Sequence, residues 1–538
     1  MSSPDASSLL LGVDVGTGSV RAGLFTAAGR LVGRGEHRIQ TWQTRPDHVE
    51  QSSDDIWRAA CAAVREALTA SGARPDSVVG IGFDATCSLV AIDANDRPVG
   101  VSLDGRNDRN VIVWMDHRAI ADAAEINATH HRVLDYVGGV ISPEMQTPKL
   151  RWVKRELPDT WQRTARWFDL PDYLTWRATG SDDRSLCSTV CKWTYLGHER
   201  RWDASYFETI GLGDLTADGF RKIGVRVRVP GERLGGLTSA AAAELGVAVG
   251  TPVAASLIDA HAGALGTLGA AGHSAPISRR MAIIAGTSAC HLATAPRGTS
   301  VPGVWGPYFE ALLPNEWLLE AGISASGAFL DHVIRSHPAH LASDTFASLD
   351  ARLTTLLGRG ATEAELTHDL HLQPNVLGNR APLADPTLRG GVSGWTLRDD
   401  PDDLAVWYLA ALQSLAYATR HIIEAFAARG RPVDLLIASG GSAANPRWCQ
   451  THADALGIPL AIPEEADGVL LGSAMLGGAA AGTHGSIEAA MQAMTRLGRI
   501  VAPDPRAADF HDRKYRVYRR MIDDQRVYRD LMAQANAT

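Results

Sequence analysis

The sequence has very little lysine: five lysines stand among its 538 residues, against 47 arginines. None of the five follows a glycine, so the chain has no P-loop of the Walker type, whose lysine reaches the phosphates of a nucleotide. The dinucleotide fingerprint of dehydrogenases is missing too, because that pattern opens a helix, whereas the glycine-rich residues 16–19 lead into a predicted strand. The sequence therefore excludes one common mode of nucleotide binding and disfavours a dehydrogenase.

Positive charge and long apolar runs are also scarce. The formal net charge is -8 and the pI is ≈ 6.1, so we expect no basic surface for nucleic acid or for an anionic membrane. The longest weakly polar run, residues 469–482, is shorter than the roughly 18 residues that a membrane span needs. Residues 1–8 are polar, lack the pattern of a signal peptide and are expected to form a short disordered tail. These absences favour a cytoplasmic protein that acts on small molecules.

Cysteine pairs with the spacing of metal sites are absent as well. The chain has six scattered cysteines, which we expect to be reduced thiols. Cys187 and Cys191 stand one helical turn apart, a spacing that suits packing in a core. The sequence therefore predicts neither disulfides nor a cysteine metal site.

A chain of 538 residues exceeds what one hydrophobic core usually supports, so we expect two domains with a catalytic cleft between them. Predicted strands alternate with predicted helices, which is typical of the α/β class. The expected strands cover residues 9–15, 20–25, 78–83, 89–92, 253–257, 281–285 and 435–438, and the expected helices cover residues 54–70, with Ser53 as N-cap, and 404–429. We place an N-terminal domain at residues 9–272, a C-terminal domain at residues 280–485 and a helical extension at residues 486–538.

Three glycine turns each follow an apolar strand. The first contains Asp14, Gly16, Thr17, Gly18 and Ser19, the second is Gly286, Thr287 and Ser288, and the third is Gly440, Gly441 and Ser442. Glycines in a tight turn let several backbone N–H groups point at one anion, and hydroxyls add donors, so the pattern indicates phosphate binding. Asp14 beside phosphate predicts a Mg²⁺ ion between the two negative groups, held partly through water. A plain glycine-rich hairpin explains any one turn, but three of the same character favour polyphosphate.

Asp259 follows an apolar strand and precedes Ala260-His261-Ala262-Gly263, where the small residues permit close approach of a substrate. Transfer of a phosphoryl group to a hydroxyl needs an acceptor for the hydroxyl proton, and a carboxylate can serve. We therefore interpret Asp259 as a general base, while an aspartate that only caps a helix is the simpler alternative. His261 is more typical of a hydrogen-bonded structural histidine.

Polar side chains that could hold a polyol recur beside apolar and aromatic residues. They are Asp84, then Asp116 and His117 after Trp114, then Lys192 between a cysteine and a tryptophan, and Glu320. Sugars favour such donors and acceptors beside flat apolar faces. In a chain so poor in lysine, Lys192 is a candidate for chemistry, although a solvated surface lysine also fits.

Taken in order, the three turns and the Asp259-Ala-His sequence resemble the motifs of the FGGY carbohydrate kinase family, over nearly the whole chain. Residues 82–90, 114–118, 185–195, 301–308 and 378–385 are similar to the D-ribulokinase branch in particular. The resemblance implies a two-domain actin-like ATPase fold of the RNase H-like type, with ATP and Mg²⁺, that phosphorylates a pentulose, D-ribulose first, at its terminal O5. It implies Asp259 as base; Cys87, Lys192 and Glu320 near the sugar; Thr17, Gly286 and Thr287 near phosphate; and Gly440, Gly441, Ser442 and Asn445 near adenosine.

One departure concerns Ile323, which stands where the family pattern usually has a glutamine. One polar sugar contact is then missing, which leaves the exact sugar open, because lost hydrogen bonds change discrimination strongly. L-ribulose, xylulose, erythritol and sedoheptulose offer a terminal hydroxyl to the same base. A chaperone-like or filament-forming actin-like ATPase and a weakly catalytic sugar sensor are the alternatives to a kinase, and a homodimer is one candidate assembly.

Overall fold

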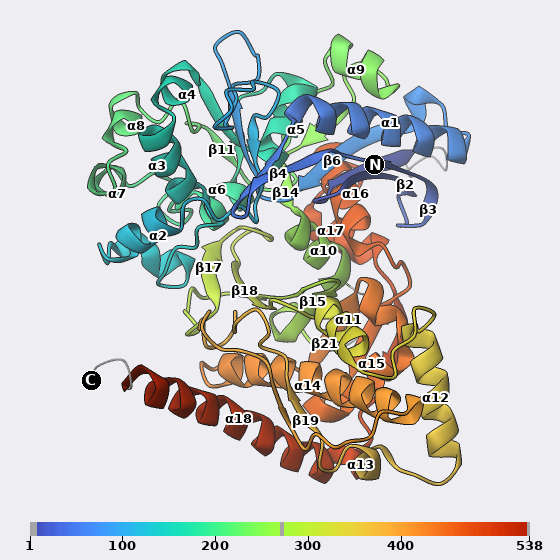
Figure 1. Cartoon of the computed structure of the whole chain (residues 1–538). Coiled ribbons are helices and arrows are strands. Elements are labelled where there is room, and N and C mark those ends of the chain that lie inside the picture. The colour runs from blue at the N-terminus through green and yellow to red at the C-terminus, as the bar shows by residue number, and fades with distance from the viewer. Residues whose placement is uncertain (1–7, 270–273, 535–538) are drawn as a thin grey trace.

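The computed structural model describes residues 8–269 and 274–534, and it shows two α/β halves that are each built on a seven-stranded sheet (Figure 1). The N-terminal half, blue to green, lies above the C-terminal half, yellow to red, in that view. Residues 1–7 of the predicted tail and the domain end placed at residue 272 lie outside the described residues. Within the described parts of the chain, none of the helices has both the length and the apolar character needed to span a membrane.

The N-terminal sheet is centred on a hairpin that the sequence predicted. Its strands, in spatial order, are β12 (Arg233–Gly236), β13 (Pro252–Ala254), β6 (Val78–Ala85), β1 (Leu9–Val15), β2 (Ser19–Thr26) and β3 (Leu31–Arg38), and β14 (Leu257–Ile258) also pairs with β6. The strands β1 and β2 are antiparallel, and β6 runs parallel to β1 on its other side. The predicted strand over residues 253–257 is split into β13 and β14.

Helix α1 (Ser53–Ser71) covers one face of this sheet with its apolar side, together with α5 (Leu170–Thr179) and α9 (Ser239–Leu245). The N-cap of α1 is Ser52, whose hydroxyl accepts a hydrogen bond from the N–H of Asp55 at 3.4 Å, so the predicted cap Ser53 is one residue too late. Ser53 is the first helical residue.

The other face of the same sheet is covered by α10 (Asp259–Leu268) and by α16 (Gly468–Ala480), which comes from the far end of the chain. In Figure 1 the orange-red α16 lies among the blue strands. A Cβ atom on Gly12 would lie 2.2 Å from the carbonyl oxygen of Leu470, and one on Gly82 would lie 1.9 Å from that of Ser473. Glycine at these two strand positions therefore lets the backbone of α16 rest on the sheet.

The C-terminal sheet repeats the central hairpin. Its strands, in spatial order, are β17 (Trp305–Phe309), β18 (Trp317–Ile323), β16 (Ala289–Ala295), β15 (Arg280–Ala285), β21 (Leu435–Ser439), β22 (Leu460–Pro463) and β23 (Leu497–Val501). A core on this sheet includes residues of α11 (Gly327–Ser336), the long predicted helix α14 (Pro401–Ala427), α15 (Pro446–Leu456) and α18 (Ala508–Gln534). The extension placed at residues 486–538 is therefore not purely helical: besides α17 (Ile487–Met494) and α18 it contains β23, an edge strand too polar to be recognised from its pattern.

A third layer is formed by segments that lie in sequence between strands of the N-terminal sheet. Its five-stranded sheet consists of β4 (Thr41–Arg45), β5 (His48–Gln51), β8 (Val111–Ile112), β7 (Leu89–Ile92) and β9 (Arg166–Asp169). Short helices surround it, namely α2 (Ile120–Asn127), α3 (Gln146–Glu156), α4 (Pro158–Arg163), α6 (Leu186–Lys192), α7 (Ala204–Thr209) and α8 (Gly213–Ala217). Helix α6 carries Lys192 at its last residue.

Candidate active site

Three acidic residues that are far apart in sequence meet at the carboxyl ends of the N-terminal strands. Asp14 stands opposite Asp84 in the parallel pair of β1 and β6, and β14, which also pairs with β6, ends at the residue before Asp259. Burial raises the pKa of Asp259 to about 6, and the negative charge of Asp14 adds to this rise. Asp259 is therefore ionised at neutral pH but is more basic than an exposed aspartate.

Asp14 and Asp84 are buried and each keeps one free carboxylate oxygen. Arg21 donates a hydrogen bond to Oδ2 of Asp14 at 2.7 Å, and Ser473 of α16 donates to Oδ2 of Asp84. Their Oδ1 atoms have no hydrogen-bond partner among residues 8–269 and 274–534. Burial raises the pKa of both groups, against the opposing charge of Arg21 on Asp14. Unpartnered oxygens of this kind fit a hard cation such as Mg²⁺ or its water ligands. Asp84, predicted to hold a polyol, is thus grouped with Asp14.

The first glycine turn is held by side chains of the third layer. The N–H of Gly16 donates to the carbonyl of Ser19 at 3.0 Å, and the indole N–H of Trp114 donates to the hydroxyl of Thr17 at 3.0 Å. This bond brings Trp114, predicted to contact sugar, to the phosphate turn. The hydroxyl of Ser19 donates instead to Glu36 at 3.0 Å, toward the exposed side of β3, so Ser19 does not offer its hydroxyl inward. Gly18 is exposed at the tip of the turn.

The second and third turns lie side by side because β15 and β21 are parallel neighbours. The N–H of Gly286 donates to the carbonyl of Ser288 at 2.8 Å, and Thr287 is exposed. Gly440 has φ 91, and a Cβ there would lie 2.5 Å from the carbonyl oxygen of Ala285, so this position requires glycine. The two predicted turns of the C-terminal half therefore form one edge of its sheet, and Gly441 and Ser442 follow there in a short 3-10 helix.

The side chain of Asn445 is fully used by the protein. Its Oδ1 accepts the N–H groups of Arg447 at 2.8 Å and Trp448 at 3.1 Å, which caps α15. Its Nδ2 donates to Asp350 at 2.8 Å and to the hydroxyl of Tyr408 at 2.7 Å. Asn445, predicted to lie near adenosine, therefore fixes the start of α15 with its side chain.

A second cluster joins Lys192 of the N-terminal half to strands of the C-terminal half. The Lys192 ammonium lies 5.3 Å from the ring centroid of Trp305, and it is buried without a hydrogen bond to any described residue. Arg380 lies 4.0 Å from the same ring and donates to Glu320 at 3.1 Å. Although burial alone would raise the pKa of Glu320, Lys192, His261 and Arg380 hold it well below its usual range. An ammonium, a guanidinium and a carboxylate beside an indole form a site suited to a polyol.

Cys87 was also predicted near the sugar, and it is a buried thiol just after β6. Burial raises its pKa to about 12, against the opposing charge of Lys192. Cys87 therefore stays protonated and can offer only a weak donor.

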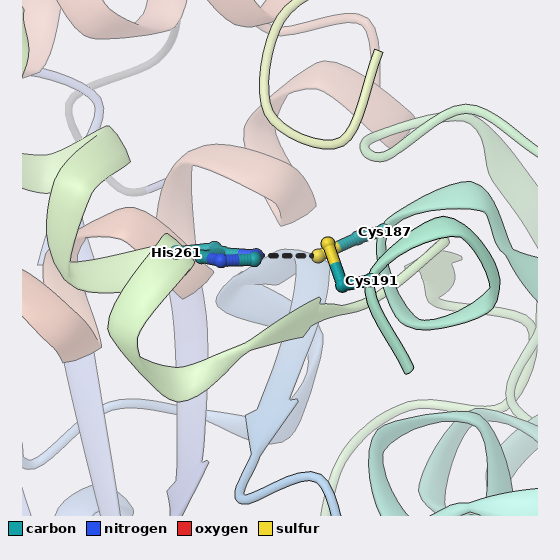
Figure 2. A group of neighbouring side chains, drawn as sticks. All are labelled: Cys187, Cys191 and His261. Atoms are coloured by element: carbon teal, nitrogen blue, oxygen red, sulfur yellow. Dashed lines mark hydrogen bonds between the residues drawn. The ribbon is translucent and has the colours of Figure 1, made fainter. Parts of the chain in front are cut away.

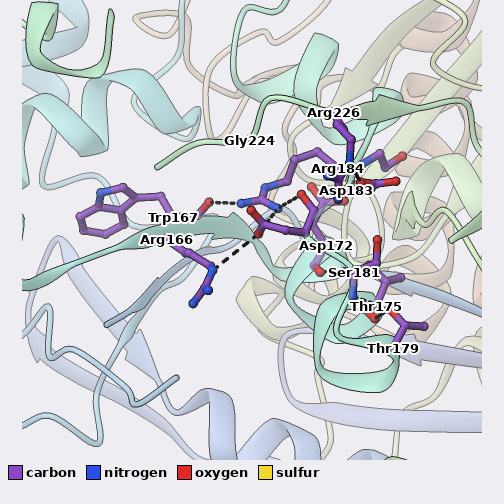
Figure 3. A network of polar contacts seen from close by, with 12 residues as sticks. Arg166, Trp167, Asp172, Thr175, Thr179, Ser181, Asp183, Arg184, Gly224 and Arg226 are labelled. Atoms are coloured by element: carbon purple, nitrogen blue, oxygen red, sulfur yellow. Dashed lines mark hydrogen bonds and ion pairs between the residues drawn. The ribbon is translucent and has the colours of Figure 1, made fainter. Parts of the chain in front are cut away.

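The position of Lys192 depends on the hydrogen bonds that hold the start of α6. Asp172 of α5 accepts from the N–H of Ser185 at 2.7 Å and from the hydroxyl of Ser188 at 2.6 Å. Figure 3 shows Asp172 beside the buried Arg184, whose guanidinium lies 4.0 Å from the ring centroid of Phe168. A short helix anchored in this way at its first turn presents Lys192 at its last residue.

Asp116 and His117 are not part of either cluster. Both oxygens of Asp116 accept hydrogen bonds from Arg118, and Oδ2 also accepts the N–H of Val49 at 2.6 Å. This buried carboxylate joins β5 to the loop that follows β8. His117 is partly exposed and faces Glu144 at 3.4 Å, which raises the pKa of His117. The structure therefore places Asp116 apart from both clusters, and its assignment to the sugar stays a prediction.

The sequence did not predict three residues of the cluster around Lys192, namely Trp305, Arg380 and His261. Arg380 belongs to the Gly378-Asn-Arg sequence already noted for its resemblance, so a signal was present. His261, read as structural, lies with Nε2 3.4 Å from Glu320 and so contacts the cluster around Lys192. A separate cavity of about 550 Å³, lined by Phe329, Trp395 and Trp407 among others, contains none of the predicted site residues.

Comparisons with known proteins agree with this geometry. The model of the FGGY family of carbohydrate kinases matches residues 9–266 with its N-terminal domain and residues 281–481 with its C-terminal domain. An FGGY carbohydrate kinase domain-containing protein of Homo sapiens is 45% identical over 540 residues, covering 97% of each chain. A D-ribulokinase of Saccharomyces cerevisiae is 38% identical over 510 residues, covering 87% of this chain and 71% of its own length. The crystal structure of a xylulose kinase from Rhodospirillum rubrum has a TM-score of 0.80 at 22% identity, covering 97% of this chain and 99% of the other, which supports the fold alone.

Proposed function

Because the chain belongs to the FGGY family of carbohydrate kinases, which use ATP as phosphate donor, we propose that it transfers the γ-phosphoryl group of ATP to the terminal hydroxyl of a pentulose, D-ribulose before others. The assignment as a sugar kinase argues against the alternative of a chaperone-like or filament-forming actin-like ATPase. The choice of D-ribulose is supported by the 38% identity to the yeast D-ribulokinase. The predicted cytoplasmic location and the homodimer stay predictions.

The observation that carries the proposal is the position of Asp259 at the first residue of α10. Its charge interacts with Asp14 on the side of the first phosphate turn and with Lys192 on the side of the polar cluster. A base that removes a proton from a sugar hydroxyl during phosphoryl transfer needs both neighbours, the phosphate site and the sugar site.

In the proposed reaction a carboxylate oxygen of Asp259 accepts the proton of the sugar's terminal hydroxyl, and the oxygen of that hydroxyl attacks the γ-phosphorus. A new P–O bond forms, the bond to the β-phosphate oxygen breaks, and ADP leaves. Lys192, Arg380 and Glu320 hold the other hydroxyls, and the indole of Trp305 covers an apolar face of the sugar. The hydroxyl of Thr287, which is exposed in the second glycine turn, contacts the phosphates from the other half.

Mg²⁺ is part of the proposal. Asp14 and Asp84 are the residues that would hold it, directly or through water, because each has an unpartnered buried oxygen. When bound, the ion would neutralise charge on the phosphate oxygens.

The test is ADP release with MgATP against D- and L-ribulose, D-xylulose, erythritol and sedoheptulose, with Asp259→Asn beside the wild type. We expect D-ribulose to give the highest kcat/KM, and Asp259→Asn to lower kcat by a factor on the order of 100 to 10,000. Asp54→Asn, in the first turn of α1, is the matched control and should retain activity. A higher kcat/KM for D-xylulose than for D-ribulose would refute D-ribulose as the preferred substrate. Full activity of Asp259→Asn would refute Asp259 as the general base. Binding of D-ribulose without turnover would favour the sugar sensor.

A further inference from the structure

Two cysteines and one histidine that the sequence did not connect form a compact buried group. Cys187 and Cys191 lie one turn apart on α6, and His261 lies in the first turn of α10. Sγ of Cys187 is 2.9 Å from Nδ1 of His261, and the ligand-type atoms of all three residues lie within 4.8 Å of one another. Figure 2 shows the sulfur of Cys187 directed at the imidazole and the sulfur of Cys191 beside it. All three side chains have 0% exposed surface.

We propose that Cys187, Cys191 and His261 form a binding site for a thiophilic metal ion, Zn²⁺ in the first place, at the contact between α6 and α10. Two sulfurs and an imidazole nitrogen are the ligand types that Zn²⁺ favours. Bonds of about 2.3 Å to sulfur and 2.0 Å to nitrogen place neighbouring ligand atoms roughly 3.5 to 3.8 Å apart around one ion. The present separations require shifts of about 1 Å, which side-chain rotation supplies.

The surroundings of His261 support the same conclusion. Its Nδ1 faces the thiol of Cys187 while its Nε2 faces Glu320 at 3.4 Å. Histidines that bind metal ions characteristically donate their other N–H to a carboxylate, which fixes the ring and its tautomer. Glu320 is placed to accept that hydrogen bond.

Charge is balanced in the occupied site. Two thiolates cancel the charge of Zn²⁺, and a neutral imidazole adds none, so no net charge is placed in a region from which water is excluded. The three protein ligands leave one position of a tetrahedral ion for a small ligand. Core packing, the reading from the sequence, accounts for two buried cysteines but not for a histidine between them and a carboxylate.

The proposed ion takes no part in the phosphoryl transfer itself, but it is linked to residues of the proposed sugar site. His261 links the metal site to Glu320, and Asp259 is two residues earlier on α10. Occupancy would hold the imidazole in one orientation and so would fix Glu320 in the sugar cluster. We therefore expect bound Zn²⁺ to change the KM for the sugar more than the KM for ATP.

The experiment uses the tag-free full chain, stripped of metal with a strong chelator and titrated with Zn²⁺ against a chromogenic chelator. We expect one tight equivalent per chain, and at least a tenfold weaker affinity in Cys187→Ser and in Cys191→Ser. Cys449→Ser is the matched control, because Cys449 is also fully buried on a helix but belongs to α15. It should bind Zn²⁺ like the wild type. No equivalent in the wild type, or equal binding by the site variants, would overturn the site.

A measurement on the unmodified chain guards against variants that fail to fold. Co²⁺ added to the metal-free wild type should give thiolate-to-metal charge-transfer absorption and the visible bands of a tetrahedral ion. A spectrum typical of oxygen ligands would overturn the site. Because the kinase assay with Mg²⁺ is run on the metal-free chain, failure of the kinase proposal and failure of the metal proposal are read separately.

Discussion

The two halves contain the same hairpin, but they differ in the side chains at the strand ends next to its glycine turn. The antiparallel pair β1 and β2 with its parallel neighbour β6 is repeated as β15 and β16 with β21. Two positions before the first glycine of the turn stands Asp14 in one copy and Ile284 in the other. Their partners on the parallel strand are Asp84 and Ser439.

This difference shows that two similar turns need not treat a phosphate in the same way. An anion beside the acidic N-terminal pair is repelled unless a cation stands between them. The C-terminal turn has no carboxylate at these two positions, so its N–H groups and hydroxyl can contact an anion directly. We therefore expect the acidic copy, which is the N-terminal hairpin with Asp14, to contribute to the chemical step. We expect the neutral copy, which is the C-terminal hairpin with Ile284, to contribute to nucleotide affinity.

Between the two hairpins, the largest effect is expected where the carboxylate of the N-terminal copy is neutralised. Asp14→Asn should lower kcat by a factor on the order of 100 or more, because one of two carboxylates beside the transferring group is lost. Asparagine still accepts a hydrogen bond from Arg21, so the fold should survive. Steady-state ADP release with D-ribulose measures the change. Ile284→Val, at the matching position, should stay within roughly twofold of the wild type; an equal loss in both variants would refute the contrast between the copies.

A smaller effect is expected at the neutral turn. Thr287→Val should raise the KM for ATP by about tenfold with little change in kcat, because a hydrogen bond to a charged group contributes about 1.5–3 kcal/mol. Thr17→Val, its counterpart, should raise the KM for the sugar as well, since Thr17 also holds Trp114. Initial rates over a grid of both substrates separate the two constants. An unchanged KM for ATP in Thr287→Val would contradict the role of this turn.

The contrast between the halves also explains what could be read from the sequence. The strands, the turns and the helix α14 are local patterns of apolar residues and glycine, and they were predicted at nearly their true positions. The position of Asp259 after a strand and before small residues was visible for the same reason. The FGGY family and the kinase class followed from these motifs and were confirmed.

Side-chain partners were not predictable, because they depend on tertiary packing. The pairing of Asp14 with Asp84 follows from the register of two strands that are 70 residues apart along the chain. Asp116 accepts hydrogen bonds from Arg118, two residues away. It also accepts one from the N–H of Val49, which only the fold brings close. His261 contacts Cys187 of α6, which is far from it in sequence, and so distant a polar neighbour leaves no local pattern around His261.

A pH experiment tests whether buried acids of the N-terminal half affect stability. Burial and the nearby Asp172 raise the pKa of Asp169 to about 8, against the opposing charge of Lys192. The folded state therefore keeps a proton that the unfolded state loses above pH ~4, so stability falls as pH rises from ~4 to ~8, by at most about 1.4 kcal/mol per unit. Asp169→Asn should flatten the decline of Tm between pH 5 and 8. The exposed Asp159→Asn should not, and parallel curves for wild type and Asp169→Asn would refute the assignment.

The smallest effect is expected for Ser19→Ala. Its hydroxyl is directed to Glu36 and away from the turn, so kcat and both KM values should stay within roughly twofold of the wild type. The same kinetic grid measures this. A large rise in the KM for ATP would mean that Ser19 turns toward the phosphate when the nucleotide binds.

The position of α16 affects how the protein is made. The helix that covers one face of β1 and β6 is translated nearly 400 residues after β6. Until then the glycines and apolar residues on that face have no native partner. The N-terminal sheet therefore cannot complete its core until α16 has been translated, and growing chains have a long interval in which chaperones can act on them.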